Sequence, residues 1–163
     1  MVERNAGGNV GEHGVGRVLE ITRVFNAPRK VVFAAWTDPK QVAQWWGPTG
    51  FTNPVCELDV RPGGAMLIHM RGPDGTIYPM NGIYKEVVPP ERLVFTASAL
   101  DKDGKAMFEN LNTVIFTEHD GKTTVALRVE VLKSSAAAEP YLAGMEMGWK
   151  MTLDRLGAHV GKR

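Results

Sequence analysis

The C-terminal segment, residues 139–163, carries one continuous apolar stripe, and this stripe limits the folds that the chain can adopt. Apolar residues recur there at steps of three and four, which places them on one face of a helix; they are Leu142, Met145, Trp149, Leu153, Leu156 and Val160. At 1.5 Å per residue, a helix of about 20 residues spans roughly 30 Å. Such a helix must bury its stripe, so we expect it to cover the apolar face of a sheet.

The segment from residue 51 to residue 131 supplies that sheet, because its apolar positions follow the period of two that is typical of strands. The alternation is clear in three stretches, which turns rich in proline and glycine separate: residues 56–60, 66–71 and 78–84. We predict further strands at residues 93–97, 114–117 and 123–131, the last two joined by the tight-turn pair Asp120-Gly121. The polar segment 101–112, which contains Gly104, is predicted to be a loop.

The residues before this run predict one strand and two short helices. Residues 17–25 alternate between apolar and polar side chains and favour a strand. Pro28 and Pro39 each precede apolar residues at helical spacing, and proline is well tolerated in a first helical turn. Because short turns join consecutive strands, we expect an antiparallel meander of about six or seven strands. The predicted fold is α+β of the helix-grip type: a curved antiparallel sheet wrapped around the long C-terminal helix, with two short helices after the first strand.

Length and composition place the chain among ordinary globular domains. Its 163 residues suit one domain, which we expect to cover residues 17–161. Residues 1–16 are rich in glycine and poor in apolar side chains, so we expect them to form a disordered tail. The net charge of +1 gives no basic excess to bind phosphates, which argues against a nucleic-acid partner.

The sequence also predicts a compartment. Cys56 is the single cysteine, so no disulfide can form within the chain, as is usual in a reducing cytosol. No stretch approaches the roughly 18 apolar residues of a membrane span, and the N-terminal residues lack the apolar core of a secretory signal. We therefore expect a cytoplasmic protein without a membrane span.

Several short motifs occur in a fixed order along the chain: Trp45–Pro48, Gly50–Thr52, Cys56–Gly64, Met70–Gly75, Pro89–Thr96, Gly148–Trp149 and Leu153–Leu156. Together they resemble the family related to the C-terminal domain of the activator of the heat-shock-protein-90 ATPase. This family belongs to the START and pollen-allergen-like (SRPBCC) superfamily, and the resemblance covers about residues 17–160. It implies the helix-grip fold. Because that superfamily hosts lipid carriers, cyclases and co-chaperone domains, the resemblance leaves three kinds of function open.

The apolar residues on the inward face of the sheet, on the facing side of the helix and near one end of the space between them define a candidate ligand-binding site. They are Trp46, Phe51, Met66, Ile68, Met70, Tyr78, Met80, Tyr84, Phe95, Met145, Trp149 and Leu153. The alternative is that they form a filled core. Methionine repacks around variable shapes, which favours a cavity, and Gly82 and Gly148 would remove side-chain volume between sheet and helix. We expect Tyr78, Tyr84 and Trp149 to orient a ligand through their polar groups.

No residue pattern predicts a catalytic centre, a metal site or a cofactor. The histidines, at positions 13, 69, 119 and 159, have no metal-ligand spacing, and no glycine pair has the context of a phosphate loop. Glu57 and Asp59 lie two apart but alternate with apolar residues, so they are expected on the solvated face. Cys56 has the parity of the apolar face and is expected to be a core thiol.

The adjacent pair Trp45-Trp46 leaves two alternatives. Neighbouring helical positions differ by about 100°, so one ring is expected in the core and the other at the surface or the cavity rim; alternatively, both are packed.

Three functions therefore stay open. The first is binding of a small apolar or amphipathic molecule or lipid. The second is a co-chaperone-like or stress-related interaction through a surface near the tryptophan pair. The third is a cyclase-like enzyme that uses His69, Glu86 or Cys56 in the cavity. A homodimer is a further prediction that the sequence does not test.

Overall fold

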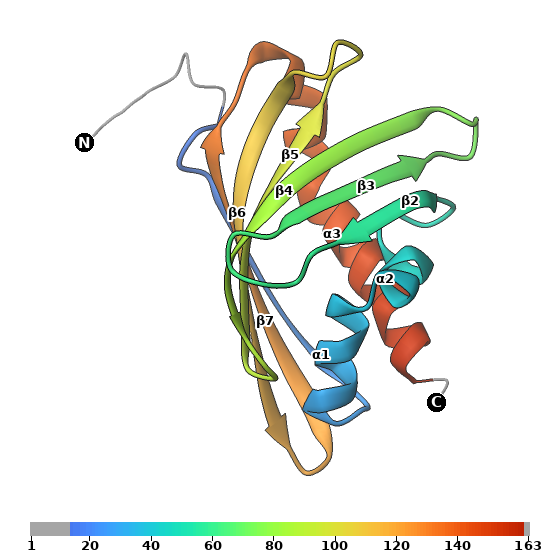
Figure 1. Ribbon diagram of the computed structural model, residues 1–163, viewed down its shortest axis with the longest axis vertical. Helices are drawn as coiled ribbons and strands as arrows, with labels where there is room; N and C mark the ends of the chain where they lie inside the picture. Colours follow the sequence, from blue (N-terminus) through green and yellow to red (C-terminus); the bar gives the residue numbers. More distant parts are fainter. Residues whose placement is uncertain (1–13, 162–163) are drawn as a thin grey trace.

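The computed structural model describes residues 14–161, which form a curved antiparallel sheet with helices on its concave side (Figure 1). The elements are β1 (Val18–Phe25), α1 (Arg29–Thr37), α2 (Pro39–Trp45), β2 (Thr52–Leu58), β3 (Ala65–Arg71), β4 (Ile77–Val88), β5 (Arg92–Leu100), β6 (Ala106–His119), β7 (Lys122–Lys133), the short 3-10 helix η2 (Ala136–Ala138) and α3 (Glu139–Val160). This order confirms the predicted helix-grip fold.

Strands β2 to β7 form an antiparallel meander, and β1 pairs with β7 at the outer edge of the sheet. Their order in the seven-stranded sheet is β1-β7-β6-β5-β4-β3-β2, and every neighbouring pair is antiparallel. β1 and β2 therefore lie at opposite edges, and the connection between them through α1 and α2 has to cross the sheet. Both helices contact α3, so all the longer helices gather on the same face of the sheet.

The C-terminal half of α3 packs into a closed core. Leu153, Leu156 and Val160 are at most 2% exposed and lie in one cluster with Val32 and Trp36 of α1. The predicted apolar stripe therefore does bury itself against other elements. Because α1 and α2 also lie there, this end of the concave face is filled with side chains.

The prediction of a loop over residues 101–112 is wrong for its second half, because β6 begins at Ala106. Asn110 pairs with Ala97 of β5 and Val131 of β7, so the backbone hydrogen bonds of this segment belong to the sheet. The side chains of Asn110 and Asn112 are buried, at 7% and 1% exposure. Polar residues on the inward face broke the apolar alternation and made a strand resemble a loop.

The N-terminal residues 1–13, which include His13 and most of the predicted tail, lie outside the described residues. Gly14 to Gly16 form a turn, and the Gly16 N–H donates to the Val131 carbonyl oxygen at 2.9 Å. In the described part of the chain, no helix combines the length and the apolar character that a membrane crossing requires.

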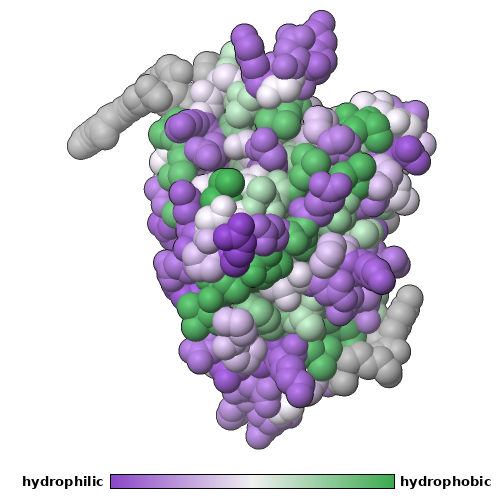
Figure 2. Space-filling view, in the orientation of Figure 1, coloured by the Kyte–Doolittle hydropathy of each residue, from purple (hydrophilic) through white to green (hydrophobic). Residues whose placement is uncertain are grey.

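Some large apolar side chains remain on the surface. Figure 2 shows a band of apolar residues between polar patches on the face in view. The most exposed large apolar residues are Val24 and Met147, at 64% and 62%. Pairing with a second copy across such a surface stays a prediction.

Candidate functional site

A pocket of about 990 Å³ lies between the sheet and the N-terminal half of α3. Its walls come mainly from β4, β5, β6 and α3, and the segment 46–48 after α2 closes one side. The exposed lining residues belong to the β5–β6 turn, to the start of α3 and to the start of β4, so the pocket opens to solvent there. Its deep end is lined by buried residues, among them Trp46, Met80 and Asn112.

Small residues keep this space open. They are Ala97 and Ala99 on β5 and Gly144 and Gly148 on α3. A Cβ atom placed at Gly144 or Gly148 would have no heavy atom within 4 Å. Protein cores are normally packed as densely as organic crystals, so small residues on both facing elements leave a hollow.

Gly82, which was expected to widen the cavity, has a different role. It does not line the pocket, and a Cβ atom there would lie 1.9 Å from the Thr96 carbonyl oxygen. Its missing side chain therefore permits close approach of the β4 and β5 backbones.

The pocket walls are apolar and adaptable. Four methionines line the pocket, one each from β3, β4, β6 and α3: Met70, Met80, Met107 and Met145. The aromatic rings that line it are those of Trp46, Tyr78, Phe108, Tyr141 and Trp149. Methionine is unbranched and polarisable, so it fits irregular apolar shapes. This lining suits an apolar body and does not impose one rigid outline.

Two asparagines bring polarity into the interior of the pocket. Asn112 is fixed, because its Nδ2 donates to the Phe95 carbonyl oxygen at 3.3 Å. Asn110 is held more weakly: its Nδ2 lies 4.0 Å from the Met145 sulfur, and its buried Oδ1 has no hydrogen-bond partner. An unmade hydrogen bond of a buried group costs about 1–3 kcal/mol. Asn110 therefore has unused capacity to bond a molecule in the pocket.

All four tryptophans of the chain form one cluster beside the pocket. Ring centroids are 4.9 Å apart between Trp36 and Trp45, 6.2 Å between Trp36 and Trp149, and 5.5 Å between Trp46 and Trp149. Trp46 and Trp149 line the pocket, whereas Trp36 and Trp45 do not. The cluster thus separates the pocket from the closed core.

Both members of the pair Trp45-Trp46 are buried, at 0% and 7% exposure. Two adjacent helical positions would point their side chains about 100° apart, but α2 ends at Trp45, and Trp46 has an extended backbone with φ −67° and ψ 135°. This change of backbone direction lets both rings pack inward. Trp46 lies at the pocket wall, and neither ring is exposed as a partner contact would require.

Arg155 of α3 holds the segment that carries Trp46. Its Nη1 donates to the carbonyl oxygens of Trp46, Gly47 and Pro48 at 2.9–3.1 Å, and its Nη2 donates to that of Gln44 at 3.1 Å. The Gln44 carbonyl belongs to the last turn of α2, where helical partners are lacking, and the other three belong to the segment just after the helix. Partial burial lowers the pKa of the Arg155 guanidinium from its usual value. Arg155 therefore ties α2 and one pocket wall to α3.

We expect Arg155→Met to lower the free energy of unfolding by about 2 kcal/mol, because it removes charge-assisted hydrogen bonds to several carbonyls. Urea unfolding would measure the loss. Arg155→Lys should recover only part of it, since an ammonium group cannot reproduce the planar fork of a guanidinium.

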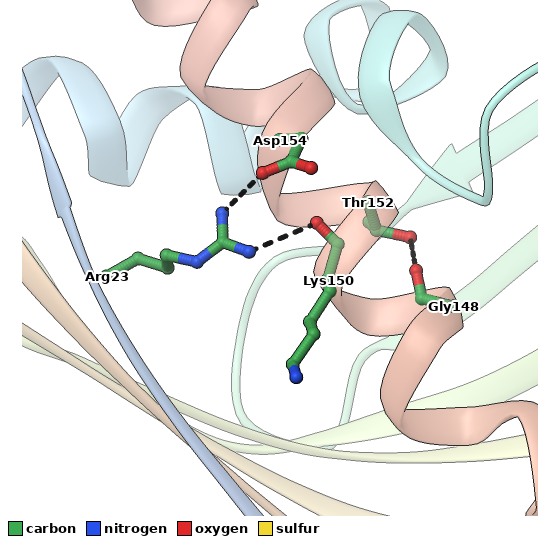
Figure 3. A network of polar contacts seen from close by, with 5 residues as sticks. All are labelled: Arg23, Gly148, Lys150, Thr152 and Asp154. Atoms are coloured by element: carbon green, nitrogen blue, oxygen red, sulfur yellow. Dashed lines mark hydrogen bonds and ion pairs between the residues drawn. The ribbon is translucent and has the colours of Figure 1, made fainter.

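The matched control for this prediction is Arg23 of β1, whose guanidinium group also bonds to α3 (Figure 3). Arg23 Nη1 donates to Asp154 Oδ1 at 2.7 Å, and its Nη2 lies 3.4 Å from the Lys150 carbonyl oxygen. The Asp154 side chain is 69% exposed, so water screens the pair and Arg23→Ala should cost less than about 1 kcal/mol. Equal losses for the two arginines would contradict the proposed role of Arg155.

Half of the predicted ligand-binding residues line the pocket: Trp46, Met70, Tyr78, Met80, Met145 and Trp149. The others do not line it. Met66, Ile68, Tyr84, Phe95 and Leu153 are buried in the core. Phe51 packs against Tyr78, with the two ring centroids 5.7 Å apart. Binding by any of these residues stays a prediction.

The candidate catalytic residues lie away from the pocket lining. His69 pairs with Val55 and Pro79 within the sheet. Glu86 is half exposed and accepts a hydrogen bond from Arg92 Nε at 2.9 Å. Burial raises the pKa of Cys56 to about 11, with Asp38 and Glu57 adding to the effect, so its thiol is protonated at neutral pH.

Glu57 and Asp59 are exposed, as the alternation predicted. Among the described residues, no group of three or more histidine, cysteine, aspartate or glutamate side chains is placed to hold a metal ion.

Sequence reasoning missed the pocket residues that β6 contributes, namely Met107, Phe108, Asn110 and Asn112. A usable signal was present. Phe108, Asn110 and Asn112 continue the parity of Phe116, and the burial of β6 follows this period up to Phe116. Reading the parity through the polar residues would have placed both asparagines on the inward face.

Comparisons with known proteins agree with the fold. The family model of "Activator of Hsp90 ATPase homolog 1-like protein" matches residues 26–161. A solved protein from Mycobacterium smegmatis is 29% identical with a TM-score of 0.73, covering 86% of this chain and 88% of that chain. The AHSA1 protein from Silicibacter pomeroyi is 27% identical with a TM-score of 0.73, covering 88% and 97%.

A protein from Arthrobacter aurescens, 24% identical with a TM-score of 0.79 over 90% of this chain and 87% of that one, shares the fold. The curated proteins include no match to this chain. Because the family model spans the region from the end of β1 to the end of α3, the chain belongs to the family of activator of Hsp90 ATPase homolog 1-like proteins.

Proposed function

We propose that this domain binds a small apolar or amphipathic molecule in the pocket between β4–β6 and α3. The observation that carries the proposal is the pocket itself, whose volume is about 990 Å³. Ligand sites typically measure about 300–1,000 Å³ and combine apolar walls with a few polar groups. The methionines, aromatic rings and two asparagines of this pocket fit that description.

The small residues on facing elements support the same proposal. A core that only had to be stable would gain from larger side chains at Ala97 and Gly148, since burying apolar surface contributes about 25 cal/mol per Å². A pocket open at one end and lined by apolar groups instead offers that free energy to a ligand.

Two alternative functions have less support from the site. An acid–base enzyme needs titratable groups at the reacting atoms, but the carboxylates and the amine among the described lining residues, Asp101, Lys102 and Asp103, lie on the turn at the mouth. A co-chaperone-like contact near Trp45-Trp46 would need exposed rings, and both rings are buried.

The test is a native mass spectrum of gently purified protein, followed by thermal unfolding with fatty acids, long-chain alcohols and alkylphenols. We expect an adduct of a few hundred daltons that is lost on denaturation. A ligand at 100 times its Kd should stabilise the fold by about 2.7 kcal/mol, which raises the Tm by roughly 5–10 °C at this chain length. Tryptophan fluorescence should report binding, because Trp46 and Trp149 line the pocket. An apo mass together with an unchanged Tm for every compound would contradict the proposal.

A further inference from the structure

The amide of Asn110 indicates which kind of molecule the pocket takes. Asn110 is 7% exposed, lines the pocket and leaves its Oδ1 without a hydrogen-bond partner. Its cross-strand neighbours are Ala97 and Val131, neither of which has a polar side chain. Buried polar groups in native proteins are nearly always hydrogen-bonded. Among the described residues, five buried side-chain atoms lack such a partner, and of these only Asn110 Oδ1 belongs to a residue that lines this pocket, so we look for its partner there.

The missing hydrogen bond is specific to Asn110, because the other asparagine of the pocket has a partner. Asn112 lies two residues further along β6 on the same face, and its Nδ2 donates to the Phe95 carbonyl oxygen at 3.3 Å. The Nδ2 of Asn110 has only the Met145 sulfur, at 4.0 Å, and sulfur is a weak acceptor. Of the two amides, that of Asn110 is the one free to rotate toward a ligand.

The distribution of charge limits what the partner can be. The carboxylates and the amine among the described lining residues belong to Asp101, Lys102 and Asp103 on the β5–β6 turn at the mouth. Asp101 is engaged there, because its Oδ1 accepts the backbone N–H groups of Asp103 and Lys105. A charged group beside Asn110 would therefore lose its hydration without gaining a counter-ion, which is strongly unfavourable. An uncharged group loses much less.

We infer that the pocket selects an apolar molecule that carries an uncharged hydrogen-bond donor, a hydroxyl or N–H group, and that this group donates to Asn110 Oδ1. The apolar body then lies against Met80, Met145 and Trp149. This inference rests on the proposed function, because it assigns a ligand class to the same pocket.

Three probes of matched size test it: 4-butylphenol, butylbenzene and 4-butylbenzoate. Their Kd values would be measured by calorimetry or by tryptophan fluorescence at neutral pH. We expect 4-butylphenol to bind about tenfold more tightly than butylbenzene, and 4-butylbenzoate to bind more weakly than 4-butylphenol. Asn110→Leu should reduce the preference for 4-butylphenol over butylbenzene to near unity.

The preference is a ratio of two Kd values for one variant, so a general change in pocket size or stability cancels from it. Asn110→Val gives a second variant of smaller volume that also lacks polar atoms, should the leucine variant fold poorly. Asn81→Leu is the matched control, because it removes an amide from an exposed position of β4 that does not line the pocket; its preference should equal that of the wild type.

The two proposals fail in different ways. Equal binding of 4-butylphenol and butylbenzene, or tighter binding of 4-butylbenzoate, would overturn the inference and leave the binding function standing. An unchanged preference in both Asn110 variants would also overturn it. Binding of none of the three probes, with an apo native mass, would contradict the binding function and the inference with it.

Discussion

Gly148→Leu is expected to weaken binding of 4-butylphenol by more than tenfold while the domain stays folded. Gly148 lines the pocket from α3, and no heavy atom lies within 4 Å of a Cβ atom placed there. The Cβ atom of a leucine is therefore accommodated, and the rest of the side chain would occupy ligand space. Replacing glycine inside a helix also gains up to about 1 kcal/mol of helix propensity, so the free energy of unfolding should not fall.

Gly157→Ala is the matched control for this prediction. It lies on the same helix, but a Cβ atom there would contact the Phe25 ring at 3.6 Å, within the ordinary van der Waals range, and Gly157 does not line the pocket. The change should give a similar gain in helix propensity and leave the Kd unchanged. Fluorescence titration and urea unfolding would measure both quantities. Wild-type affinity in a folded Gly148→Leu variant would place the ligand outside the pocket.

Trp45→Ala is expected to lower the free energy of unfolding by about 3–5 kcal/mol, the usual cost of deleting a large buried aromatic side chain. Trp45 is fully buried, its Nε1 donates to the Ala35 carbonyl oxygen at 2.9 Å, and its ring packs edge-on against Trp36. The variant loses apolar burial and leaves that carbonyl without its side-chain partner. Denaturant unfolding monitored by circular dichroism would measure the loss.

Two variants separate structure from function at this pair. Trp45→Phe keeps an aromatic ring but no N–H group, so it should lose less stability than Trp45→Ala. Trp46→Phe changes a ring that lines the pocket, so it should alter ligand affinity more than Trp45→Phe does. A loss below about 1 kcal/mol for Trp45→Ala would show that the ring is not needed to hold the core together.

The sequence predicted the fold well because the signals it used are local. The period of the stripe from Leu142 to Val160 follows from helix geometry, and the alternation around Ile68 follows from strand geometry. Short turns then restrict neighbouring strands to antiparallel pairing. The exception was β6, where Asn110 and Asn112 interrupt the apolar alternation because they face a cavity.

The candidate site was predicted only in part, because the parity of a residue gives its face and not its depth along the sheet. Met80 and Tyr84 share a face of β4, yet Met80 lines the pocket and Tyr84 lies in the closed core. Burial raises the pKa of the Tyr84 hydroxyl well above its usual range, and this hydroxyl has no hydrogen-bond partner.

The sequence by itself determined the order of the elements, the inward faces of most strands and the apolar stripe of α3, since each depends on backbone periodicity over a few residues. Only the tertiary structure decided where the concave face is filled and where it is hollow. That division depends on contacts between distant segments: α1 and α2 pack against the C-terminal half of α3, while Gly144 and Gly148 face the small residues of β5 across the pocket. Volume left between distant elements has no periodic signature in a sequence.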